Sequence, residues 1–245
     1  MSNPAARDCT RILLKLSGEA LGADKGVGID DVMLGSVCQE IADAASSGTQ
    51  IGVVIGGGNF FRGVKVSAAG FERTSADYIG MLATVMNALA VEQGLGRLGV
   101  DVHVLSAIPM SPVCETYTRR AAVAYLESGG VVVFAAGTGN PFFTTDTAAS
   151  LRAAEIGADI LIKATKVDGV YDSDPMENPK ARKYDSISYD SVLQQRLGIM
   201  DAAAIAICRD NNLNLRVMSV QQRGNLQKLL SGEPVGTLIS SEDDV

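Results

Sequence analysis

Short apolar runs alternate along this chain with segments whose apolar residues recur every three or four positions. The runs are rich in Val, Ile and Leu, which is typical of buried strands, and they occupy residues 11–17, 50–55, 100–105, 131–135, 160–162 and 215–217. Helical spacing predicts helices around residues 33–48, 79–89, 121–126, 147–156, 192, 202 and after 224, and residues 237–239 fit an edge strand. This alternation predicts an α/β fold, a three-layer αβα sandwich with a mostly parallel central sheet.

Loops rich in glycine and polar residues follow several of the predicted strands. They span residues 15–18, 56–63 (GGGNFFRG), 137–146 (GTGNPFFTTD) and 163–174. A strand that opens through such a loop into a helix presents backbone N–H groups, hydroxyls and a helix N-terminus together, and this combination binds phosphate. For any one loop an ordinary turn is an equal explanation. Their common place at the carboxyl edge of one sheet favours an anion site.

Charged residues near these loops are suited to phosphoryl transfer, in which positioning and electrostatic stabilisation do most of the work. They are Lys15, Arg62, Lys163, Lys166, Asp77, Asp146, Asp174 and Asp201. Taken singly, each has a plainer explanation: a solvated lysine at a strand end, a surface ion pair for Arg62, or a helix cap at Asp146. Neither the P-loop signature GxxxxGK[ST] nor a complete GxGxxG fingerprint occurs in the sequence.

Composition narrows the class of protein. The chain has 245 residues and a net charge of -7, which argues against general binding of nucleic acid. With four widely spaced cysteines and one histidine, a zinc site is not expected, and His103 is predicted to be buried and hydrogen-bonded. No apolar run has membrane length and the first residues lack a signal-peptide core, so we expect a cytoplasmic protein without membrane contact.

Long motifs add what spacing alone does not supply. RILLKLSGEAL (11–21), IGVVIGGGNFFRG (51–63), GMLATVMNALA (80–90), AGTGNPFFTTDTAA (136–149) and KATKVDGVYDSDP (163–175) closely resemble bacterial-type UMP kinases of the amino-acid-kinase superfamily. The resemblance runs from about residue 11 to 240. It implies a single domain over residues 1–245, with residues 11–150 mainly a UMP-binding lobe and residues 151–240 mainly an ATP-binding lobe.

The same resemblance implies that ATP phosphorylates UMP, with Mg²⁺ bound through the nucleotide phosphates and no metal site in the protein itself. The implied ATP contacts are Lys15, Leu16, Ser17, Gly18, Gly58, Arg62, Thr165, Tyr171 and Asp174. The implied UMP contacts are Gly57, Asp77, Thr138, Gly139, Asn140, Pro141, Phe142, Phe143, Thr144 and Thr145. The residues implied in catalysis are Lys15, Arg62, Asp146 and Asp201.

Regulation and assembly are also implied only by the resemblance, which is to GTP-activated, UTP-inhibited homohexamers. The region of the GTP response is residues Ala23, Asp24, Lys25, Gly26, Val27 and Gly28. The wide apolar stripe of the helix at residues 79–89 is explained most simply by the core, and an assembly surface is the alternative. Two other functions stay open: a carboxylate or carbamate kinase, and a non-catalytic nucleotide sensor or storage protein on the same fold.

Overall fold

The computed structural model describes residues 10–22, 27–61, 70–219 and 223–241. Its strands are β1 (Arg11–Leu16), β2 (Gln50–Ile55), β3 (Val102–Ser106), β4 (Glu115–Thr116), β5 (Val131–Ala135), β6 (Ile160–Thr165), β7 (Ser186–Ser188), β8 (Asn214–Ser219) and β9 (Thr237–Ser240). Its helices are η1 (Gly18–Ala20), α1 (Asp31–Ser46), α3 (Arg73–Arg97), α4 (Arg119–Glu127), α5 (Thr145–Ile156), α6 (Tyr189–Gln194), α7 (Ala202–Asp210) and α8 (Asn225–Leu230).

The described strands form a single nine-stranded sheet in the order β4-β3-β5-β2-β1-β6-β8-β9-β7. All pairs are parallel except β8 with β9. The predicted α/β sandwich is therefore confirmed, but the predicted edge position of residues 237–239 is wrong. Strand β9 lies between β8 and the short β7, a strand of three residues that is too brief to show a periodic signal in the sequence.

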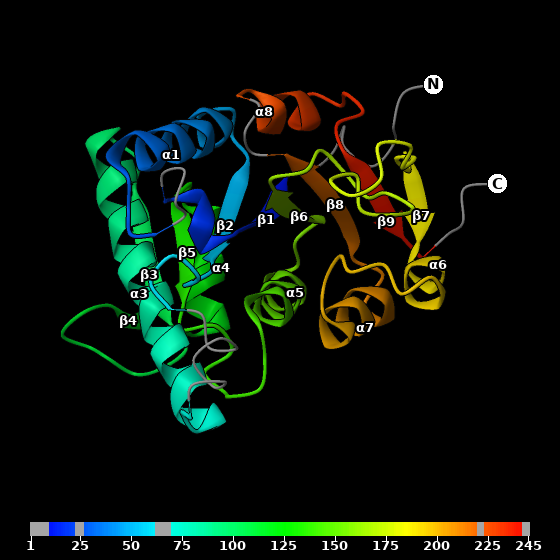
Figure 1. The fold of residues 1–245 in the computed structure, drawn as a ribbon. Coiled ribbons are helices and arrows are strands. Elements are labelled where there is room, and N and C mark those ends of the chain that lie inside the picture. The colour runs from blue at the N-terminus through cyan, green and yellow to red at the C-terminus, as the bar shows by residue number, and fades with distance from the viewer. Residues whose placement is uncertain (1–9, 23–26, 62–69, 220–222, 242–245) are drawn as a thin grey trace.

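Helices cover both faces of the sheet (Figure 1). Helices α1, α3 and α8 pack on one face, and α4, α5, α6 and α7 pack on the other. Because side chains alternate along a strand, β1 sends Leu14 and Leu16 to the first face and Leu13 to the second. Strand β1 is central and pairs with both β2 and β6, so its carboxyl end lies in the middle of the sheet edge.

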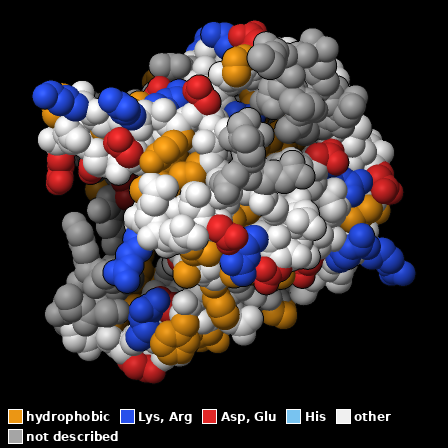
Figure 2. Space-filling model, turned by 90° about the vertical axis from the view of Figure 1, so that its right-hand side faces the viewer, with side chains coloured by type: hydrophobic (Ala, Val, Ile, Leu, Met, Phe, Trp, Pro, Cys, Tyr) orange, Lys and Arg blue, Asp and Glu red, His pale blue; other side chains and the backbone are white. Residues whose placement is uncertain are grey.

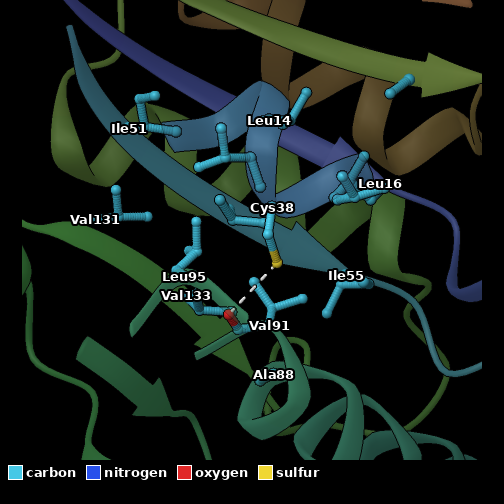
Figure 3. Packing of buried hydrophobic residues seen from close by; sticks show 14 of the residues in the cluster. Leu14, Leu16, Cys38, Ile51, Ile55, Ala88, Val91, Leu95, Val131 and Val133 are labelled. Carbon is cyan, nitrogen blue, oxygen red and sulfur yellow. Dashed lines mark hydrogen bonds between the residues drawn. The ribbon is translucent and has the colours of Figure 1, made fainter. Parts of the chain in front are cut away.

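Close packing between α1 and α3 completes the first face (Figure 3). The Cys38 thiol lies 3.8 Å from the Val91 carbonyl oxygen, among side chains from β1, β2 and β5. A Cβ at Gly94 would stand 2.5 Å from the Cys38 sulfur, so glycine is what permits this approach. Burial raises the pKa of Cys38 to about 11, which keeps the thiol neutral.

The outer surface is mixed in charge where Figure 2 views it, from the side of α6 and β7. Acidic and basic side chains are interspersed on this face. Among the helices within the described ranges, none combines the length and the apolar content that crossing a membrane requires.

Candidate functional site

Two lysines and one aspartate meet at the carboxyl edge of the sheet. Lys15 on β1 and Lys163 on β6 are direct partners in the parallel register, and both face α5. Asp146, in the first turn of α5, forms an ion pair with each of them: the Lys15 Nζ–Oδ1 and Lys163 Nζ–Oδ2 distances are 2.7 Å. The three side chains are only 10%, 14% and 15% exposed, respectively for Lys15, Lys163 and Asp146. We refer to them as the Lys–Asp–Lys trio.

Burial and charge act in opposite directions within the trio. Burial by itself would raise the pKa of Asp146, but the ammonium groups of Lys15 and Lys163 outweigh it and hold that pKa below its ordinary value. Burial lowers the pKa of Lys163, with a contribution from Lys15, and Asp146 partly opposes this. Two ammonium groups against one carboxylate leave a surplus positive charge in a poorly solvated place, which suits an anionic ligand.

The N-terminal cap of α5 fixes the position of Asp146, and it differs from the cap that the sequence suggested. Thr144, not Asp146, is the N-cap, and its hydroxyl accepts from the backbone N–H groups of Asp146 and Thr147 at 3.1 and 3.4 Å. A cap of this kind satisfies free N–H groups of the first turn and so fixes where the helix begins. Asp146 is thereby left free to face the lysines.

Asp201 plays a different part from Asp146. It is the N-cap of α7, where its Oδ1 accepts from the Ala204 N–H at 3.0 Å. It also accepts the hydroxyl of Thr147 at 2.9 Å and that of Thr144. These bonds tie α7 to the start of α5. Asp201 therefore supports the helix that carries Asp146, and its charge, like that of Asp146, partly opposes the lowering of the Lys163 pKa.

A cavity of about 780 Å³ opens beside the trio, between α1, α8 and the ends of β1, β6 and β8. Of the expected ATP contacts, those that line it are Lys15, Leu16, Ser17 and Thr165. Gly18, Gly58, Tyr171 and Asp174 are not among the described residues of its lining. Other polar side chains also line it, both basic and acidic: Lys163, Lys166, Glu19, Asp30, Glu40, Ser36, Ser219 and Asn225. Arg62 lies outside the described residues.

A second cavity, of about 260 Å³, lies between α3 and the loop that precedes α5. Of the expected UMP contacts, those that line it are Gly57, Asp77, Thr138, Asn140, Phe143, Thr144 and Thr145. Gly139, Pro141 and Phe142 belong to the same loop but are not among its described lining residues. Other residues that line it are Phe61, Ala76, Gly80, Met81, Thr84 and Gly137.

The loop over this cavity is held in an uncommon backbone conformation. Phe142 has a φ of 72°, in the left-handed region that non-glycine residues rarely occupy. Its N–H donates to Asp77 Oδ2 at 2.7 Å, and Arg73 Nε donates to the same carboxylate at 2.8 Å. Backbone strain of this kind persists only where surrounding contacts enforce it, and it concentrates at ligand sites.

Other predicted residues lie outside the two cavities. The Tyr171 hydroxyl donates to Asp168 Oδ1 at 2.6 Å, and Asp174 accepts from the Met176 N–H at 2.8 Å within a turn. Of the implied GTP region, Ala23, Asp24, Lys25 and Gly26 lie outside the described residues, whereas Val27 is exposed and Gly28 is bonded to Asn59.

The prediction of a buried His103 is wrong. Its side chain is partly exposed, its ring stacks on Tyr125 at 3.6 Å, and its Nε2 lies 3.2 Å from Asp101. Position 103 is near the start of β3, away from the packed end of that strand. Within the described ranges, no three His, Cys, Asp or Glu side chains gather in a way that could hold a metal ion.

The profile of the amino acid kinase family matches residues 10–219. The chain belongs to the amino acid kinase family. The crystal structure of a UMP kinase from Bacillus anthracis is 38% identical and covers 97% of this chain and 98% of its own, with a TM-score of 0.94. The structure of a UMP kinase from Ureaplasma parvum is 36% identical in sequence, and the match covers 95% of this chain and 99% of that one, with a TM-score of 0.89. The structure of a uridylate kinase from Archaeoglobus fulgidus is 29% identical in sequence, and the match covers 94% of this chain and 99% of that one, with a TM-score of 0.71.

Within the amino acid kinase family, these identities group the chain with the bacterial-type UMP kinases, as its motifs indicated. Lys163, already named among the charged residues suited to phosphoryl transfer but not among those that the resemblance implies in catalysis, shares Asp146 with Lys15. A signal for it exists in the sequence: Lys163 interrupts the apolar run ILIKAT, much as Lys15 interrupts RILLKL. A lysine inside a buried strand needs a charged partner, and the structure shows that both lysines share the same one.

Proposed function

We propose that this protein transfers the γ-phosphoryl group of ATP to UMP and produces ADP and UDP, a step of pyrimidine nucleotide biosynthesis. The observation that carries the proposal is the Lys–Asp–Lys trio and its position. Lys15 lines the larger cavity, and Asp146 directly follows Thr144 and Thr145, which line the smaller one. The trio thus stands where two nucleotides in the two cavities would bring their phosphates together.

We assign ATP to the larger cavity and UMP to the smaller one. In the reaction an oxygen of the UMP phosphate attacks the γ-phosphorus, the bond from the γ-phosphorus to the bridging oxygen of ADP breaks, and ADP leaves with that electron pair. The attacking oxygen is already anionic at neutral pH, so no proton has to be removed and no general base is required. This agrees with a site built of lysines and aspartates rather than histidine.

The residues of this chain then act by charge and position. Lys15 stabilises the negative charge that spreads over the transferred group, and Asp146 orients Lys15. Lys163 holds Asp146 from the other side and is itself fixed by a hydrogen bond to the Ile199 carbonyl. Arg62, as a further cation, and Mg²⁺, which arrives with ATP as part of the substrate, complete the neutralisation of two polyanions.

Assembly and regulation belong to the same proposal. Helix α3 exposes Tyr78, Ile79, Leu82 and Met86 to between 36% and 50%, a stripe at helical spacing that fits an interface between copies of this chain in a homohexamer. We further propose that residues 23–28 take part in activation by GTP, that UTP inhibits, that the enzyme works in the cytoplasm, and that residues 11–150 and 151–240 mainly serve UMP and ATP, respectively.

The decisive experiment measures ADP formation from ATP and Mg²⁺ with UMP, CMP, AMP or no acceptor, each with and without GTP. Turnover with UMP alone is expected, and a GTP effect would support the regulatory part. If UMP supports no turnover, the same assay is repeated with carbamate and with a carboxylate as acceptor, and turnover with either would favour the other kinase chemistry. Nucleotide binding without turnover on any acceptor would indicate a sensor or storage protein.

A further inference from the structure

Helix α3 carries three polar side chains, and each of them holds a loop of the site by a hydrogen bond. Asp77 accepts the N–H of Phe142, as described above. Thr84 accepts the N–H of Ala136 at 2.8 Å, and Ala136 has a φ of 61° in the left-handed region. Asn87 donates to the Gly56 carbonyl oxygen at 2.7 Å. Positions 77, 84 and 87 share one face because seven and three residues are close to whole helical turns.

Asn87 is paired with Asn59, the residue that ends the Gly56–Gly58 loop. Asn87 Nδ2 donates to Asn59 Oδ1 at 2.7 Å, and Asn59 Nδ2 donates to Asn87 Oδ1 at 3.0 Å. Asn59 is 2% exposed and Asn87 is fully buried. Buried amides of this kind are costly unless they are bonded, and these two satisfy each other.

The pair also reaches a third segment. Asn59 Nδ2 donates to the Gly28 carbonyl oxygen at 2.7 Å, and the Gly28 N–H donates to the Asn59 carbonyl oxygen at 3.0 Å. Every N–H of both side-chain amides is therefore used: on Gly28, on Gly56 and on the partner amide. A network with all its donors satisfied holds one arrangement of the three segments.

The loop after β1 packs directly on this pair. A Cβ at Gly18 would stand 2.5 Å from Asn59 Oδ1 and would also overlap the Gly56 carbonyl oxygen. No side chain fits between the two loops, so the Lys15–Gly18 loop rests on the backbone that Asn59 and Asn87 hold. The place of Lys15 relative to Gly57 and Gly58 thus depends on two amides that line neither cavity.

We propose that Asn59 and Asn87 are a positioning pair for phosphoryl transfer: together they fix the Gly56–Gly58 loop against the Lys15–Gly18 loop and tie both to Gly28. The inference rests on the proposed function. The pair touches neither nucleotide, so it acts on the alignment of the reacting groups. Misplacement of about 1 Å can lower a rate by about 100-fold, whereas binding through the rest of a nucleotide changes less.

The test is a double-mutant cycle with Asn59→Ala, Asn87→Ala and both together, in which kcat, the KM for each nucleotide and the thermal unfolding midpoint are measured. Each single substitution is expected to lower kcat by about 10- to 100-fold and to change the KM for UMP by less than about 3-fold. Because the two amides act as one unit, the double variant is expected to lose no more than the worse single variant.

Tyr189→Phe is the matched control. It removes another buried hydrogen bond from a side chain to a backbone carbonyl, 2.6 Å from the Tyr189 hydroxyl to the Leu213 oxygen, far from the loops. The control is expected to lower the unfolding midpoint while leaving kcat unchanged. If an alanine variant does not fold, Asn87→Ser, which keeps a small polar group, takes its place in the same cycle.

Three outcomes are informative. A wild-type protein that does not phosphorylate UMP would overturn the proposed function and not this inference in particular. An active wild type with an unchanged kcat in folded Asn59→Ala and Asn87→Ala variants would overturn the positioning pair. Losses that multiply in the double variant would show that the two amides act separately, which also contradicts the proposal.

Discussion

At the scale of single residues, the site depends on how buried charges are paired. Lys15 and Lys163 lie inside apolar strands, where an unpaired ammonium would be costly. The ion pairs with Asp146 offset the cost of burying both ammonium groups. Because Asp146 has two partners, the removal of one lysine leaves the carboxylate paired with the other. This redundancy separates an effect on chemistry from an effect on folding.

Lys15→Ala is expected to lower kcat by at least about 1000-fold while the protein remains folded, because Asp146 keeps its ion pair with Lys163. Steady-state kinetics and circular dichroism check this. Lys183→Ala is the matched control, since Lys183 pairs with Asp168 at 3.2 Å outside both cavities. Near-normal turnover in a folded Lys15→Ala protein would contradict the assignment of Lys15.

The contribution of the trio to the free energy of unfolding is expected to fall at acidic pH. The pKa of Asp146 is lower in the folded protein than in the unfolded chain, so its ion pairs stabilise the fold above the unfolded pKa of about 4 and cease to do so as the pH falls through the folded pKa. Urea unfolding of wild type and Asp146→Asn should therefore differ most near pH 7, by about 3 kcal/mol, and the two should begin to approach each other only as the pH falls below about 4. A constant difference over this range would argue against the ion pairs.

At the scale of elements, the ends of strands decide where chemistry is placed. The loops after β1 and β2 pack without a side chain between them, and α3 holds the second loop and the loop before α5 from one face. Helix α3 thus packs on the core with one set of side chains and holds the loops of the site with another. Its apolar positions were readable from periodicity, whereas the polar ones at Thr84 and Asn87 gave no separate signal.

Gly18→Ala is expected to lower both kcat, by about 100-fold, and the unfolding midpoint, because its Cβ would overlap the Gly56 carbonyl, a backbone atom that cannot swing away. Gly35→Ala is the control. Gly35 lies on α1 with nothing within 4 Å of an added Cβ, so alanine there should stabilise the helix by about 1 kcal/mol without altering turnover. Thermal unfolding and kinetics on both variants test the contrast; full activity in Gly18→Ala would rule out the close packing of the loops.

At the scale of the whole molecule, one face of α3 is left uncovered by the residues that the structure describes. Tyr78, Ile79, Leu82 and Met86 are exposed there, beside the face of the same helix that completes the core. From the sequence, the core is the simplest explanation of the apolar stripe of this helix. The structure shows that the core accounts for Met81 and Val85 but leaves these four residues exposed.

Leu82→Glu combined with Met86→Glu is expected to convert an assembly into smaller species, since charges in an apolar interface are costly to desolvate. Light scattering after size exclusion measures the molar mass, and circular dichroism confirms folding. Leu193→Glu, at a position 36% exposed on α6, which packs on the other face of the sheet from α3, is the control and should leave the mass unchanged. A wild-type protein that runs as a monomer would refute the proposed interface.

Much of this protein could be predicted from sequence, because periodicity records which side of each element is buried. The extents of β1, β2 and β5 and the places of α1, α5 and α8 agree with the predicted segments. The family followed from long uninterrupted motifs. The short strands β4 and β7 were missed because two or three residues carry no period.

The sequence by itself determined the α/β class, the family and the loops that surround the site, because these follow from local patterns along the chain. Only the tertiary structure decided which residues meet. Lys15 and Lys163 are 148 positions apart and become neighbours because β1 and β6 pair in the sheet. Asn59 and Asn87 meet because α3 packs back over the end of β2. Such contacts depend on strand order and helix packing, which no local pattern encodes.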